Sequence, residues 1–111
     1  MGKIYGYIQY DSESDRVLQK AAIDKFVKDK YKEMSTEIEY LEEEVKPYIS
    51  WKNRKLGKEL LPKLEKGDVV VVSESKRLGS SSPEIDLFLM YATDKGAEVY
   101  EARLNTKISG Y

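Results

Sequence analysis

The chain of 111 residues contains no cysteine and no histidine. Without cysteine it forms no disulfide and offers no thiolate nucleophile. Without histidine it lacks the commonest general base and metal ligand, which excludes Ser-His-Asp triads and zinc sites. Any catalysis would therefore depend on serine, tyrosine, lysine, arginine or carboxylates. We expect no metal and no other cofactor.

The sequence also lacks long apolar runs and a strong excess of one charge. No segment approaches the roughly 20 apolar residues of a membrane helix, and the N-terminal "MGKIYGYIQY" is unlike the apolar core of a signal peptide. We therefore expect a cytoplasmic protein without membrane contact. The 19 basic and 20 acidic residues give a net charge of −1, a poor balance for a DNA-binding protein that acts alone.

Length and composition predict one soluble globular domain over residues 1–111, and hydrophobic periodicity divides it into strands and helices. The four valines Val69–Val72 are typical of a central parallel strand that is buried on both faces. We expect strands at residues 3–10, 35–43, 69–72 and 97–102, and helices at 14–30, 53–66 and 83–95. This β-α-β-α-β-α-β order predicts an α/β, three-layer fold with an open, mainly parallel four-stranded sheet flanked by helices.

Several residues mark the expected element ends. Ser12 or Ser14 can cap the first helix, and Ser82 can cap the third helix, with Pro83 as its first residue. A bend is expected at Pro62 in the second helix. The acidic run at residues 42–44 is interpreted as a solvated turn.

Two polar loops carry the functional signal. In open α/β sheets, ligands bind at the carboxyl ends of the strands. Here the first strand runs into "QYDSESD" and the valine strand into "SESKRLGSSSPE". The second loop predicts an anion site, because a helix N-terminus, serine hydroxyls and an arginine fork all suit phosphate. Its phosphate-binding candidates are Arg77, Ser80, Ser81 and Ser82. A helix cap beside a surface cation is the open alternative.

Together the loops resemble the catalytic domain of the serine recombinases, the resolvases and DNA invertases. "YIQYDSESD" stands at the family's nucleophile strand, "SKRLGSS" at its Leu-Asp-Arg-Leu-Gly-Arg-Ser signature, and "NRKLGKELLPKLEKGD" at its leucine-rich helix. The resemblance extends over nearly the whole chain and implies a resolvase-like, flavodoxin-like topology. In the family a serine attacks a DNA phosphodiester to form a 5′-phosphoserine link, and arginines neutralise the phosphate.

The chain departs from the family pattern at the residues that carry this chemistry. Gln9 stands at the position of an arginine, and Asp11 at that of the nucleophile. Lys76 replaces an acid, and Ser80 replaces a second arginine. The resemblance therefore implies a homologue that has lost strand-exchange activity.

Other positions keep the pattern. Arg77 and Arg54 match family arginines and are expected to bind phosphate, and Asp68 closes the Gly-Asp motif. The resemblance implies a site lined by Gln9, Asp11, Lys76 and Asp68. Ser12 is the fallback nucleophile, although a cap of the first helix is its simpler role.

The substitutions at Asp11 and Lys76 amount to a charge swap between the two loops. We expect Asp11 to pair with Lys76 or Arg77, so that a carboxylate of the chain takes the place of a substrate phosphate.

Three function classes follow. The first is an inactive recombinase homologue with an accessory or regulatory role linked to DNA recombination, bound weakly to DNA, to a recombinase or to another protein. The second is an active strand-exchange recombinase that uses Ser12. The third is a small-anion-binding or signalling α/β domain unrelated to DNA. The family's long dimerisation helix and C-terminal DNA-binding domain are not in this sequence, so we expect a monomer or a weak dimer.

Overall fold

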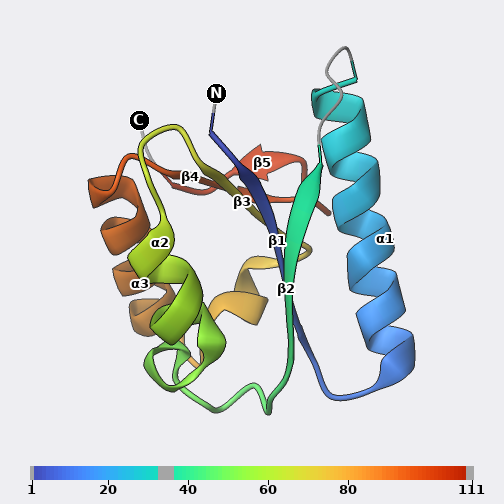
Figure 1. Ribbon diagram of the computed structural model, residues 1–111. Coiled ribbons are helices and arrows are strands. Elements are labelled where there is room, and N and C mark those ends of the chain that lie inside the picture. The colour runs from blue at the N-terminus through green and yellow to red at the C-terminus, as the bar shows by residue number, and fades with distance from the viewer. Residues whose placement is uncertain (1, 33–36, 110–111) are drawn as a thin grey trace.

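The computed structural model describes residues 2–32 and 37–109 and shows a mainly parallel sheet between two layers of helices (Figure 1). The strands lie in the order β2-β1-β3-β4-β5. Their bounds are β1 (Ile4–Tyr10), β2 (Ile38–Glu44), β3 (Val69–Val72), β4 (Glu98–Glu101) and β5 (Thr106–Lys107). The predicted three-layer α/β class is confirmed. The sheet has five strands rather than four, because the two-residue β5 adds an antiparallel edge to β4.

The helical segments divide between the two faces of the sheet. One layer is α1 (Glu13–Lys30), and the opposite layer holds α2 (Leu61–Lys63) and α3 (Ser82–Asp94), as Figure 1 shows. Short turns complete the set: the 3-10 turns η1 (Trp51–Asn53) and η3 (Ser75–Leu78), and the π-helical turn η2 (Leu56–Leu60). Residues 35 and 36 of the predicted second strand lie outside the described residues.

The side chains of the two central strands, β1 and β3, are buried on both faces of the sheet. All four valines of β3 are buried, as the unbroken apolar run predicts for a strand covered on both faces. Tyr5 and Tyr7 of β1 join the core beneath α3, whereas Ile4 and Ile8 pack toward α1. Within residues 4–8, isoleucines and tyrosines therefore face opposite sides of the sheet.

The second helix differs from the continuous helix predicted for residues 53–66. It is a π-helical turn, η2, followed by the single turn of α2, and it ends at Lys63. Leu61 donates its N–H to the carbonyl of Leu56, a wider-than-α spacing, just before Pro62, which has no N–H to give. Leu64 is already extended, so the chain turns toward β3 earlier than predicted.

The N-cap of α1 agrees with the sequence prediction, and the N-cap of α3 does not. Ser12 is the N-cap of α1, and its Oγ accepts a hydrogen bond from the N–H of Asp15 at 3.3 Å. The prediction that Ser82 caps α3 is wrong by one residue. The carbonyl of Ser81 accepts the first helical hydrogen bond, from Ile85, so Ser82 already lies inside the helix. Across the two described ranges, no helix combines the length and apolar character that a bilayer crossing requires.

Ile8→Ala should destabilise the protein by about 2–5 kcal/mol, because it leaves a cavity in a fully buried site between β1 and α1. Val17→Ala is the matched control, since Val17 is 52% exposed on α1; its effect should stay within about 0.5 kcal/mol. Urea unfolding measures both. Equal losses for the two variants would contradict the assigned packing.

Candidate functional site

The carboxyl edge of the sheet joins the two loops that the sequence singles out. Arg77, in η3 after β3, donates from Nη1 to Oε1 of Gln9 at 3.2 Å and from Nη2 to Oδ1 of Asp15 at 3.0 Å. Its Nη2 also lies 3.6 Å from a carboxylate oxygen of Glu74. The side chains of Arg77 and Asp15 are only 16% and 24% exposed. The arginine is therefore neutralised inside the protein.

The predicted pairing of Asp11 with Lys76 or Arg77 is wrong. Asp11 is exposed in the turn between β1 and α1, and it makes no ion pair with any described residue. Lys76 is 70% exposed and lies 3.4 Å from Glu74. The carboxylate on Arg77 comes instead from Asp15, in the first turn of α1. The carboxylate that pairs with Arg77 therefore comes from four residues further along the chain than predicted.

Two glutamines hold this ion pair in position. The amide Nε2 of Gln9 donates to the carbonyl of Val45 at 2.7 Å, which leaves its Oε1 to face Arg77. Gln19 donates to the carbonyl of Gln9 at 2.6 Å and to Asp15 at 2.9 Å. Both glutamines are almost fully buried, and buried amides need such partners. The prediction included Gln9 but missed Gln19, which shares the buried side of α1 with Ile23, Phe26 and Val27.

Arg54 is a buried structural residue. It is 1% exposed, and its three guanidinium nitrogens donate to the backbone carbonyls of Ile49, Arg77 and Pro47 at 2.8–3.1 Å. Its Nη1 also lies 3.4 Å from the hydroxyl of Tyr7. These contacts join the loop before η1 to η3, and the predicted phosphate contact would require them to break.

Glu43, which sequence reasoning placed in a solvated turn, lies buried in β2. Its carboxylate accepts the hydroxyl of Tyr7 at 2.8 Å and the N–H groups of Lys55 and Leu56 at 2.9 and 3.1 Å. A negative charge is favourable there because the start of the second helical segment presents free N–H groups. Burial, and next the Glu43 carboxylate, raise the pKa of Tyr7 far above its usual value, so the phenol stays protonated.

The start of α3 also holds a carboxylate of the chain. Glu84 accepts a hydrogen bond from the Oγ of Ser80 and another, at 2.6 Å, from the backbone N–H of Trp51. Burial acts to raise the pKa of Glu84, but the hydrogen bonds from Ser80 and Trp51 outweigh it and leave the pKa below the usual value. The predicted anion ligands Ser80, Ser81 and Ser82 are exposed around this carboxylate.

Asp68 lies apart from the other predicted site residues, which corrects its assignment to the site. It precedes the first residue of β3, so it sits at the amino edge of the sheet, opposite the loops. Its two carboxylate oxygens accept the N–H groups of Lys3 and Glu65 at 2.9 and 2.8 Å. Asp68 therefore fixes the entry to β3.

No protein-family model matches the chain, and a search of curated proteins found no relative. Within the part of the chain that the structure describes, no group of carboxylates is arranged to hold a metal ion. At the carboxyl edge of the sheet, the cations and carboxylates of the site neutralise one another.

Asp15→Asn should lower the free energy of unfolding by about 1–3 kcal/mol, because it removes the charged acceptor of the mostly buried Arg77. Asp11→Asn, four residues earlier and exposed, should change it by less than about 0.5 kcal/mol. Thermal and urea melts at neutral pH measure both. A larger loss for Asp11→Asn would reverse the assignment.

Glu84→Gln should destabilise the protein at neutral pH, and this deficit should shrink in acid. A carboxyl group with a lowered folded-state pKa contributes stability above its unfolded pKa and loses that contribution as pH falls through the folded pKa. Unfolding free energies of wild type and variant between neutral pH and pH of about 3 test this. A deficit that stays constant with pH would show that the Glu84 charge is irrelevant.

Proposed function

We propose that this chain is a resolvase-like domain without strand-exchange chemistry, with an accessory or regulatory role linked to DNA recombination that it performs by binding. The observation that carries the proposal is the neutralisation of Arg77 by Asp15 and Glu74. The resemblance of the two loops to the serine recombinases supplies the link to recombination.

Electrostatics at the carboxyl edge disfavours phosphate. An incoming phosphodiester would have to displace the carboxylate of Asp15 from Arg77 and would approach the exposed acids Asp11 and Glu13. The second arginine, Arg54, is committed to carbonyl groups in the interior. The same geometry argues against a small-anion-binding role.

Catalysis by Ser12 receives no support from the geometry. Its Oγ accepts the N–H of Asp15 as the cap of α1, and the neighbouring Glu13 and Asp15 are paired with Arg16 and Arg77. Both arginines are therefore already engaged and are not free to stabilise an alkoxide at Ser12. Loss of a single electrostatic donor commonly costs about 10²–10³ in rate, and a phosphate at Ser12 would meet no free arginine among those that match the family.

Incubation with supercoiled and nicked DNA should give neither strand cleavage nor a covalent adduct. Gel electrophoresis under denaturing conditions and mass spectrometry of the protein are the readouts. A 5′-phosphoserine link at Ser12 would refute the proposal and establish an active recombinase.

A designed variant tests the reason for the inactivity. Asp15→Asn combined with Glu74→Gln frees Arg77, so added phosphate should raise the melting temperature of this variant and leave that of the wild type unchanged. Glu44→Gln combined with Glu59→Gln makes the same change in net charge at exposed sites outside the Arg77 cluster. Equal phosphate responses in all three proteins would mean that internal neutralisation does not block the site.

A further inference from the structure

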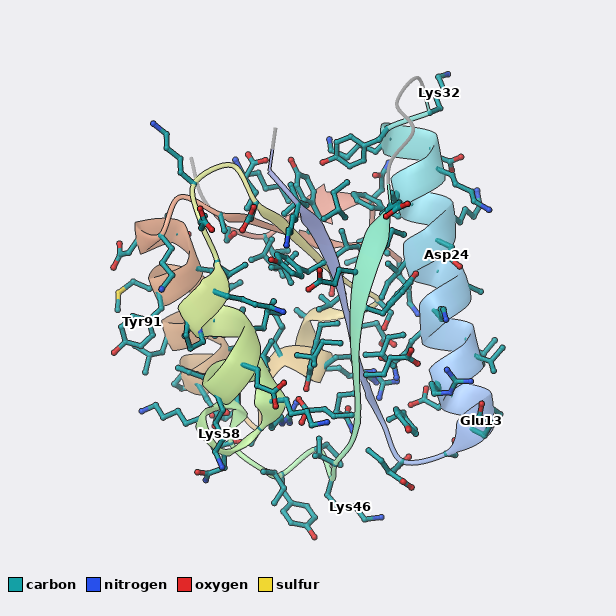
Figure 2. The ribbon with its side chains drawn as sticks, in the orientation of Figure 1. Glu13, Asp24, Lys32, Lys46, Lys58 and Tyr91 are labelled. Atoms are coloured by element: carbon teal, nitrogen blue, oxygen red, sulfur yellow. The ribbon has the colours of Figure 1, made fainter. Side chains whose placement is uncertain are left out.

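The composition of α3 sets it apart from the rest of the chain. Its 13 residues include no lysine or arginine, although the whole chain has 19. Its outer side exposes Met90 and Tyr91, which are 52% and 42% exposed; Figure 2 shows Tyr91 at the outer side of the helix. A surface helix of a globular protein normally turns mixed polar and charged residues to solvent. The outer side of α3 is instead apolar and acidic.

A groove runs along this side of α3. It has a volume of about 370 Å³ and lies between α3 and the segment that follows β5. Its far wall is fixed to the sheet, because Ile108 donates its N–H to the carbonyl of Val99 and Ser109 accepts the N–H of Val99, both at 2.8 Å. The groove is lined by Asp86, Leu89, Met90, Thr93, Asp94, Ile108 and Ser109.

Two carboxylates without ion-pair partners flank the apolar lining. Neither Asp86 nor Asp94 forms an ion pair with any residue in the described ranges. Asp94 lies in the last turn of α3, where the helix dipole disfavours an anion. The adjacent Lys95 does not compensate it, since its Nζ donates to the carbonyl of Pro62. Helix stability therefore does not explain Asp94.

We propose that this groove docks a cationic amphipathic helix of a partner protein. Asp86, Met90 and Asp94 follow one another at four-residue steps, so the two carboxylates are about 12 Å apart along the helix axis with Met90 between them. Basic residues two helical turns apart, with apolar residues between them, complement this pattern. Met90 is suited to the apolar contact, because its unbranched side chain adapts to varied surfaces. The inference goes beyond the proposed function, because it gives the binding role a surface and a partner chemistry.

A second copy of the chain is the competing occupant. The outer side of α1 exposes Val17 and Leu18 near Lys25 and Lys28, a basic and apolar combination. However, α1 and α3 lie on opposite sides of the sheet (Figure 2). A contact between them would be heterologous and would build a closed ring or an open chain of molecules rather than a two-fold dimer. The observations therefore favour a foreign segment.

The test uses a fluorescein-labelled synthetic helix of leucine and lysine residues with a 3.6-residue period, titrated with the whole protein and followed by anisotropy. We expect saturable one-to-one binding that weakens with added salt. Asp86→Lys with Asp94→Lys should reduce the affinity roughly tenfold or more. Glu44→Lys with Glu59→Lys is the matched control, because it makes the same charge change at exposed sites outside the groove. Met90→Ser, which removes only the apolar contact, should also weaken binding.

Three results would overturn the proposal. The first is the absence of saturable binding. The second is an equal loss of affinity in the control variant, which would reduce the effect to net charge. The third is sedimentation showing concentration-dependent chain growth that the Asp86 and Asp94 changes abolish, which would make a second copy the occupant. Circular dichroism melts confirm that each variant is folded. The DNA cleavage assay is independent of all of these outcomes, so either proposal can fail without the other.

Discussion

The central strand β3 is paired with β1 on one side and β4 on the other, and its valines are buried on both faces. Polar groups are costly to bury without hydrogen bonds. Among the polar groups that follow β3, the Oγ of Ser73 is buried without a hydrogen-bond partner, whereas others have partners at the carboxyl edge. Arg77 donates hydrogen bonds to Gln9 and Asp15, and the N–H of Ser75 donates one to a carboxylate oxygen of Glu101. The edge that would serve as a ligand site in an open sheet is closed by its own side chains.

This closure links stability and function. A cation that is tied to Asp15 and Glu74 contributes to the folded state, and for the same reason it is withdrawn from any external phosphate. The start of α3 repeats the pattern, with Glu84 held by Ser80 and Trp51. A fold does not fix a function, and in the function proposed here the loops that resemble a catalytic site serve as structural contacts. The groove proposed as a docking site lies apart from them, along α3.

The sequence predicts the parts of the structure that depend on local pattern. The alternation in β1 and the valines of β3 indicate strands, and the helical spacing indicates α1, so the fold class follows. The spacing does not give the buried side of α1, because Val17 and Leu18 are 52% and 59% exposed. The approach of the two loops also follows, because parallel strands bring their carboxyl ends to one edge. The identity of the carboxylate that pairs with Arg77 does not follow from the sequence. Asp11 and Asp15 have the same side chain, and only the path of the chain into α1 brings Asp15 to the arginine.

Other predictions are wrong for the same reason, because they concern contacts that depend on the path of the folded chain. Glu43 lies in a run of three glutamates, and the hydroxyl of Tyr7 and the N–H groups of Lys55 and Leu56 distinguish it from its neighbours. Arg54 matches a family arginine by position, yet its role depends on three carbonyls that lie at short range only in the folded chain. The place of Asp68 directly before β3 indicates the amino edge of the sheet. The Gly-Asp motif of the resemblance instead placed Asp68 at the site.

The central claim is that Asp15 and Arg77 are coupled inside the protein. A double-mutant cycle with Asp15→Asn, Arg77→Gln and the combined variant measures this coupling from the free energies of unfolding. The account predicts a favourable coupling of about 1–3 kcal/mol that persists at high salt, because both side chains are mostly buried. A coupling near zero, with the two single losses simply additive, would contradict it.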